Sequence, residues 1–233
     1  SSCIGPIIPP SILMVLYGSM SDVSIPALFL GGLIPGLLLG LFMMIYVYFA
    51  ARGEGVEPAP RARPAQIARS LLVNAPPLAT PFVIIAGLVF GVVTPTEAGV
   101  IAIAYACIVS ALYGDLTWSS LGSMLEEALI TTTQIMFILG MSSLFGWLIT
   151  TEQLPQAMAA FFAESGYGHI AFLLAVNVIL LILGTFMSLT SILVIFTPTL
   201  VGMGTSLGVD PVHLGVVVVL NLTVGLITPP LGW

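Results

Sequence analysis

Long apolar runs, each able to form a helix, limit how this chain can fold. Residues 25–51 contain no charged side chain, and neither do residues 170–183. A run of about 20 apolar residues spans a bilayer as a helix, whereas the strands of a membrane barrel would alternate apolar and polar residues. Charged residues make up only 6% of the chain, against roughly a quarter in a soluble domain. The sequence therefore predicts an all-α integral membrane protein.

Two of the apolar runs are interrupted by nearly the same motif, one near each end of the chain. Residues 5–10 read GPIIPP and residues 225–230 read GLITPP. Proline removes a backbone donor and breaks a helix, and in hydrocarbon the freed groups survive only beside protein or a polar cavity. Broken helices in corresponding halves of a chain mark the binding site of secondary transporters. We therefore expect transport, with the site at the two breaks.

The basic residues predict the topology. All four are arginines, and all lie within residues 52–69, which the positive-inside rule places in the cytoplasm. Counting spans from there, the broken helix at 1–18 points outward and the one at 211–233 points inward. The two halves are then inverted repeats, as transporter folds of this kind require.

Between the breaks, local signals divide the chain further. Thr94 and Glu97 flank Pro95 as a capping box, and Asp210 with Pro211 is expected to cap the last helix. We expect an interfacial stretch at 66–73, spans at 25–51, 77–93, 96–113 and 126–150, and polar connections at 114–123 and 152–165.

A re-entrant hairpin is predicted at 168–206. Its polar tip lies at 185–191, its second arm is expected to be too short for a full crossing, and residues 202–210 are expected to form a loop. The predicted organisation is a first-repeat transport segment at 1–18, scaffold-type helices at 19–125 with the cytoplasmic loop 52–69, and a second-repeat transport domain at 126–233.

The residues at the breaks suit a hard cation. Unwound carbonyls and hydroxyls are ligands for Na⁺ rather than for a transition metal, so we expect Na⁺ near Gly5 and Gly225 as a coupling ion and no other cofactor. No basic residue lies within a span, so an anion would be held by helix ends or by residues outside this sequence. The candidate site residues are Ser2, Gly5, Pro9, Pro10 and Ser11 at the first break, Gly184, Thr185, Ser188, Thr190 and Ser191 at the hairpin tip, and Asn221, Gly225, Thr228, Pro229 and Pro230 at the second break.

Other interpretations were weighed against this one. A single Pro-Pro step is more often a packing kink than a site, and hydroxyls such as those of Thr133, Ser142 and Ser143 mostly bond within helices or join them. A channel would show a continuous polar stripe, and an intramembrane enzyme would need a nucleophile–base pair or a metal set at the span centres. The net charge of −6 does not suggest a nucleic-acid partner.

Four ordered motifs, at residues 4–11, 94–98, 209–213 and 221–230, make the chain resemble the large membrane subunit of tripartite ATP-independent periplasmic (TRAP) transporters. The resemblance covers essentially the whole chain, and the full-length subunit would add an N-terminal half and a C-terminal segment. It implies an elevator-type, Na⁺-coupled importer of C4-dicarboxylates, keto acids or sugar acids in the bacterial inner membrane, not an enzyme. The implied partners are a small membrane subunit, a periplasmic substrate-binding protein and the lipid bilayer. A stand-alone Na⁺-coupled anion symporter of a related superfamily is the rival.

The hairpin tip departs from the family pattern. The family typically has Phe-Met-Asp, then a small residue and Thr, whereas residues 186–190 read FMSLT. Ser188 thus replaces the usual carboxylate, which puts in doubt any contact that depends on its charge.

Overall fold

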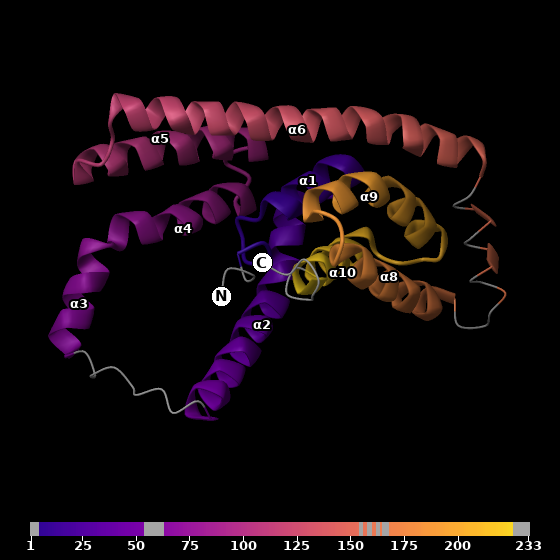
Figure 1. Ribbon diagram of the computed structural model, residues 1–233, viewed down its shortest axis with the longest axis horizontal. Coiled ribbons are helices and arrows are strands. Elements are labelled where there is room, and N and C mark those ends of the chain that lie inside the picture. Colours follow the sequence, from indigo (N-terminus) through magenta and orange to yellow (C-terminus); the bar gives the residue numbers. More distant parts are fainter. Residues whose placement is uncertain are drawn as a thin grey trace. The chain divides into compact units, whose positions relative to one another are not determined.

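A computed structural model describes residues 5–53, 63–153, 156–157, 160–161, 164 and 168–225, and its regular elements in this part of the chain are helices (Figure 1). Four of them are long and apolar enough to cross a bilayer, or five if the bent pair α3 and α4 is one span. These findings support the predicted all-α membrane protein. The main helices are α1 (Ile12–Ser21), α2 (Ile25–Gly53), α3 (Pro64–Val73), α4 (Ala75–Val89), α5 (Pro95–Tyr113), α6 (Trp118–Thr151), α8 (Gly168–Gly184), α9 (Leu189–Ser206) and α10 (Pro211–Gly225).

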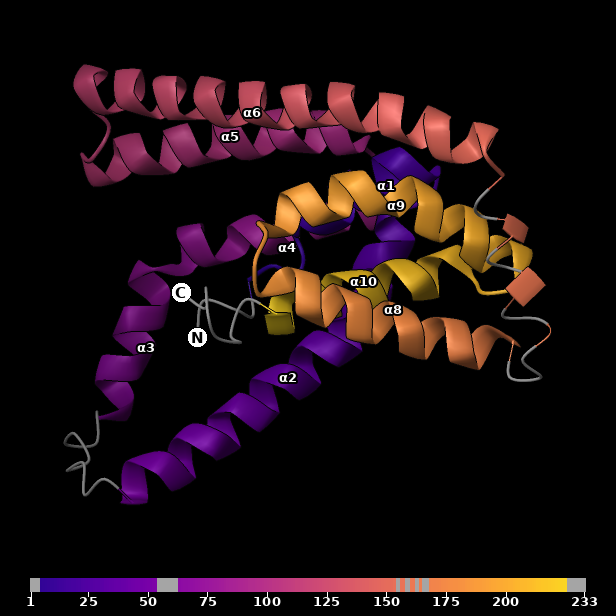
Figure 2. The ribbon, with the colours of Figure 1, turned by 45° about the vertical axis from the view of Figure 1, so that its right-hand side comes forward.

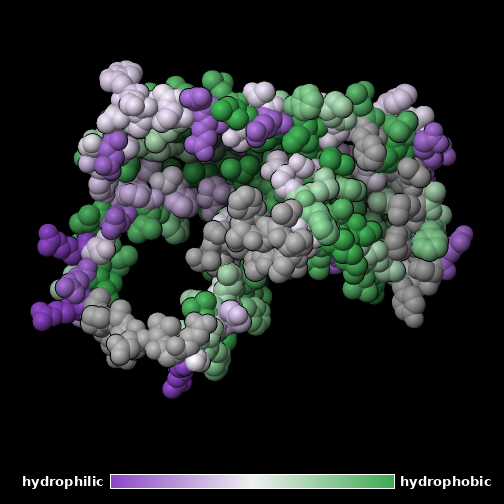
Figure 3. All heavy atoms as spheres, in the orientation of Figure 1, coloured by the Kyte–Doolittle hydropathy of each residue, from purple (hydrophilic) through white to green (hydrophobic). Residues whose placement is uncertain are grey.

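The surface of the chain is largely apolar. Large side chains such as Phe90 and Trp118 are 81% and 91% exposed, and apolar residues cover much of the face shown in Figure 3. A soluble protein rarely leaves apolar patches of this extent uncovered. The exposed surface therefore agrees with a protein surrounded by lipid or by further membrane helices.

The chain forms two compact units. One contains Ser1–Gly36 and Met124–Trp233, and the other contains Leu37–Ser123. The first unit holds the two break motifs and the predicted hairpin. The second holds most of α2 together with α3, α4 and α5.

In the first unit, α8 and α10 run parallel to each other. Asn221 Nδ2, one turn before Gly225 in α10, donates a hydrogen bond of 2.5 Å to Asn177 Oδ1 near the middle of α8. At their C-terminal ends, Gly184 and Gly225 are in backbone contact. The two helices therefore finish side by side.

Helix α9 returns in the opposite direction, so that α8 and α9 form a helical hairpin (Figure 2). Gly204, near the end of α9, faces Leu214 and Phe172, which lie near the starts of α10 and α8. A Cβ on Gly204 would lie only 2.8 Å from Leu214 Cδ2. The end of α9 thus packs against the beginnings of its two neighbours.

The predicted helix caps are confirmed. Thr94 Oγ1 accepts a hydrogen bond from Glu97 N, and Glu97 Oε2 accepts one of 2.8 Å from Thr94 N. Asp210 Oδ1 accepts one of 2.9 Å from His213 N, which fixes the start of α10. Both caps satisfy amide groups that would otherwise be unpaired at a helix start.

Several predicted boundaries were wrong, because capping motifs were missed. Helix α4 ends at Val89 rather than at 93, since Gly91 adopts a left-handed conformation and Val92 N bonds Gly87 O in a Schellman arrangement. Helix α6 starts at Trp118 rather than near 126, because the side chains of Thr117 and Ser120 each cap the other's backbone amide.

The second arm of the hairpin was also predicted wrongly. Helix α9 continues to Ser206, although residues 202–210 were expected to be a loop. Pro198 lies inside α9 without ending it, and the helix closes only where Val209 N bonds Gly204 O beyond Gly208. The arm is therefore long enough to span a bilayer, and its shortness no longer supports a re-entrant hairpin.

Candidate functional site

The hairpin tip and the second break meet at two glycines. A Cβ on Gly225 would lie 3.1 Å from the Cα of Gly184, and a Cβ on Gly184 would lie 3.2 Å from the Cα of Gly225. The carbonyl oxygens of Gly184 and Leu222 border this contact, at 3.7 and 3.9 Å from those two Cβ positions. Two regions that are distant in sequence are therefore in direct backbone contact.

The electrostatics of this region favour a cation. Helix α8 ends at Gly184, and α10 is described as far as Gly225. The carbonyls of Ile182 and Leu183 accept hydrogen bonds from the amides of Thr185, Phe186 and Met187, and a helix carries about half a negative charge at its C-terminal end. Because α8 and α10 run parallel, their negative ends add at the same place.

Hydroxyl groups at the tip are engaged in local hydrogen bonds. Thr185 Oγ1 donates 2.7 Å to Ile182 O, while Ser188 is the N-cap of α9 and accepts from Ser191 N. The Ser188 and Ser191 hydroxyls are also bonded to each other at 2.7 Å. Thr190 is half-buried in the first turn of α9. These hydroxyls therefore shape the tip, and their remaining lone pairs are available to a ligand.

Asn221 lies one turn before the second break and is 7% exposed. Its Nδ2 donates to Asn177 Oδ1 and to Val217 O, so both amide hydrogens are used. The side-chain oxygen is the part of Asn221 that can accept from a donor or bind a cation. Asn177 itself was not predicted to belong to the site, and an amide in the middle of the apolar run 170–183 was the only signal for it.

The first break forms a separate, tightly packed turn. Ser11 is the N-cap of α1, accepts from Met14 N at 3.3 Å, donates to Pro6 O, and is 1% exposed. Pro9 is buried, whereas Gly5 and Pro10 are exposed. Among the described residues, no hydrogen bond joins this break to the hairpin tip. Ser2, Thr228, Pro229 and Pro230 lie outside the described residues.

Tyr17 joins α1 to α10 and was missed by the sequence analysis. Its hydroxyl donates 2.8 Å to Pro211 O at the start of α10, and its ring is fully buried. The ring fills the space beside Gly215, where a Cβ would lie 2.4 Å from Tyr17 Cε1. Helices α1 and α10, which carry the two breaks, are therefore locked together.

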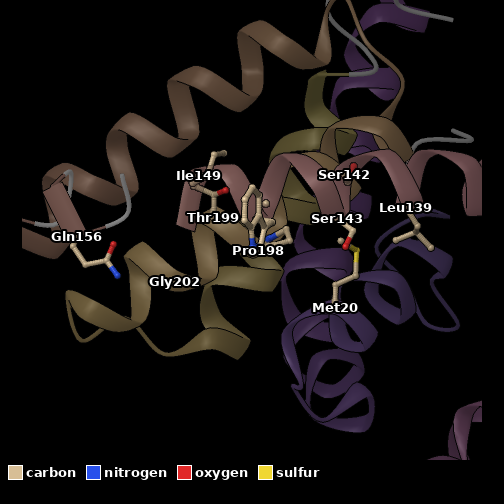
Figure 4. A pocket seen from close by; sticks show the side chains of 11 residues that line it. Met20, Leu139, Ser142, Ser143, Ile149, Gln156, Pro198, Thr199 and Gly202 are labelled. Atoms are coloured by element: carbon tan, nitrogen blue, oxygen red, sulfur yellow. The ribbon is translucent and has the colours of Figure 1, made fainter. Parts of the chain in front are cut away.

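A cavity of about 540 Å³ lies between α6 and α9 in the same unit (Figure 4). Thr133 Oγ1 bonds back to Leu129 O, as predicted for hydroxyls in these helices. The Ser142 hydroxyl departs from this prediction. It is buried and has no hydrogen-bond partner among the described residues. The cavity walls include Met20, Leu139, Ser142, Ser143, Thr199 and Gly202, and none of the described residues that line it is charged.

Comparison with known families assigns the chain. The sequence profile of the family described as "Tripartite ATP-independent periplasmic transporter, DctM component" matches residues 1–233. The chain belongs to this family. The resemblance to TRAP large subunits inferred from the four motifs is thereby confirmed.

Relatives of this TRAP permease chain agree with the assignment. It is 39% identical over 234 residues to the sialic acid TRAP transporter large permease protein SiaM of Vibrio cholerae, covering 100% of this chain and 55% of the relative. It is 39% identical over 230 residues to the C4-dicarboxylate TRAP transporter large permease protein DctM of Pseudomonas aeruginosa, covering 98% and 54%. The isethionate TRAP transporter permease protein DctMQ of Oleidesulfovibrio alaskensis is 36% identical over 234 residues, which cover 100% of this chain and 37% of that relative.

The comparisons also bear on the length of the chain and on whether it is an enzyme. The chain spans about half the length of the first two relatives. The relatives are transporter permeases, so the prediction that the chain is not an enzyme is confirmed.

Proposed function

We propose that this chain is part of the membrane permease of a Na⁺-coupled TRAP transporter that imports an organic anion across the bacterial inner membrane. A periplasmic binding protein delivers the anion, and a small membrane subunit completes the complex. The names of the TRAP relatives support this partnership. The two break motifs belong to inverted repeats, and the unit that carries them moves as an elevator.

The observation that carries Na⁺ coupling is the meeting of two helix C-termini at Gly184 and Gly225. Their summed dipoles attract a cation, and backbone carbonyls suit a hard ion with oxygen ligands. No acidic side chain is among the candidate residues, so the site offers neutral oxygens rather than a proton-binding carboxylate. Na⁺ fits this set better than H⁺.

The relatives and the helix starts support an organic anion as the substrate class. Sialic acid, C4-dicarboxylate and isethionate transporters are among the relatives, and all three substrates carry an acidic group. Ser11 and Ser188 are the N-caps of α1 and α9, and helix N-termini attract anions. We assign the anion to these starts and the cation to the ends of α8 and α10.

The experiment uses the complete transporter reconstituted in liposomes with its binding protein. A Na⁺ gradient without a pH gradient should drive uptake, and removal of the binding protein should abolish it. Uptake driven by a pH gradient in Na⁺-free buffer would refute Na⁺ coupling. Uptake of free substrate without the binding protein would instead favour the stand-alone symporter.

A further inference from the structure

Asn177 interrupts the apolar sequence of α8. It is the one polar residue between Ile170 and Leu183, and its side chain is half-buried. A polar side chain inside a membrane span is costly, and such residues commonly serve a function. The transport proposal gives Asn177 no role of its own, although its partner Asn221 is a candidate site residue.

A chain of hydrogen bonds fixes how the two amides are turned. Asn177 Nδ2 donates 2.6 Å to Leu173 O in its own helix, so the other end of the amide, Oδ1, faces α10. That oxygen accepts 2.5 Å from Asn221 Nδ2, which also donates 2.9 Å to Val217 O. Turning the Asn221 amide over would bring its oxygen against two other oxygens. The hydrogen-bond network therefore selects one orientation of this amide.

The selected orientation leaves the side-chain oxygen of Asn221 available. Both amide hydrogens of Asn221 are used, and no hydrogen bond to its Oδ1 is found among the described residues. The residue is only 7% exposed, and an acceptor without a partner is costly in so enclosed a place. A bound cation would satisfy this oxygen, because amide oxygens are ligands for hard cations.

The position of Asn221 suits this role. It lies one turn before Gly225 in α10, and the carbonyl of the next residue, Leu222, borders the contact between Gly184 and Gly225. The proposed function assigns this contact to Na⁺. The simplest alternative is that the two amides only join the helices, as polar side chains often do in membranes. Joining the helices would be served equally by the reverse pairing, whereas a cation ligand requires the Asn221 oxygen to be left free.

We propose that Asn177 is a positioning residue, which holds Asn221 so that its side-chain oxygen is a ligand of the coupling Na⁺. This inference rests on the proposed Na⁺ coupling. Asn177 touches neither the ion nor the substrate and acts only through Asn221. Groups that orient a metal ligand in this way typically change metal affinity by about 10–100-fold.

The test measures Na⁺ binding to the complete permease in detergent. Na⁺ replaces choline at constant ionic strength, and the rise of the unfolding temperature with Na⁺ concentration gives the affinity. We expect Asn177→Leu to weaken Na⁺ affinity about ten-fold or more. Asn177→Ala is a second variant with the same expected result, in case leucine crowds the helices.

Two further variants separate positioning from packing. In Asn221→Asp, the carboxylate presents an oxygen whichever way it is turned, so Asn177→Leu should have little further effect on Na⁺ affinity in this background. Thr223→Val is the matched control. The Thr223 hydroxyl is buried in α10 like the Asn221 amide, but it bonds back to Val219 O in its own helix. Its removal should leave Na⁺ affinity at the wild-type value.

The outcomes distinguish this inference from the proposal on which it rests. Unchanged Na⁺ affinity in the folded Asn177 variants would overturn the positioning role. An equal loss from Asn177→Leu in the Asn221→Asp background, or an equal loss in Thr223→Val, would also overturn it. If Na⁺ does not stabilise the wild-type permease at all, the Na⁺ coupling itself is refuted, and the positioning role with it.

Discussion

The contact between Gly184 and Gly225 makes a prediction about the sign of an alanine substitution. In a helix, Gly→Ala normally stabilises by up to about 1 kcal/mol, because glycine loses more backbone entropy on folding. Neither glycine has a positive φ, so backbone conformation does not oppose alanine at either position. Only the close approach of the two helix ends opposes alanine at these positions.

The structure gives the size of the opposing effect. An added Cβ at either glycine would lie 3.1–3.2 Å from the backbone of the other, against an optimum of about 3.5–4.0 Å between carbon atoms. The obstacle is main chain, which cannot rotate away, so the helix ends must separate. Overpacking of this kind costs about 1–3 kcal/mol. We therefore expect Gly184→Ala and Gly225→Ala to destabilise, and the valine variants to do so more strongly.

The assay is thermal unfolding of the complete permease in detergent, together with uptake in liposomes at matched protein levels. Gly99→Ala is the control, because an added Cβ there would meet nothing within 4 Å, and it should be neutral or stabilising. Uptake should fall more than ten-fold in Gly225→Val. An increase in stability in both Gly184→Ala and Gly225→Ala, or normal uptake in Gly225→Val, would refute the reasoning.

Three other experiments test the remaining contacts. Ser188→Ala removes the N-cap of α9 and should cost about 1 kcal/mol of stability. It should weaken Na⁺ or substrate affinity less than ten-fold. Complete loss of uptake in folded protein would contradict this expectation. Tyr17→Phe loses one hydrogen bond, worth about 0.5–1.5 kcal/mol. Gly215→Ala instead forces the buried Tyr17 ring to move. Thermal unfolding should therefore show a larger loss of stability for Gly215→Ala. In a double-mutant cycle, alanine at Asn177 and Asn221 should show a coupling of about 0.6–1.7 kcal/mol, and strict additivity would show that the amide pair contributes nothing.

The sequence predicted features that depend on local chemistry. The Thr94 and Asp210 caps follow from residue types at fixed spacings, and the apolar runs predicted the helices. Boundaries failed where a short motif extended or ended a helix, as at Gly91 and at Thr117 with Ser120. The prediction for α9 failed because residues 202–210 were expected to form a loop, whereas the helix continues to Ser206.

The candidate site was predicted only in part, because its contacts join distant segments. The tip and the second break were both predicted as parts of the site, but the approach of Gly184 to Gly225 depends on how α8 packs against α10. Likewise, nothing in the sequence pairs Asn177 with Asn221 or Tyr17 with Pro211. Such pairs become visible only when the helix packing is known.

The most direct test of the central claim is the structure of the complete transporter, determined once in Na⁺ and once with Na⁺ replaced by choline. We expect density for a cation among the backbone carbonyls at the ends of α8 and α10, beside Gly184 and Gly225, in Na⁺ only. A Na⁺ ion held away from these helix ends, or no Na⁺-dependent density in the transporter, would contradict the account.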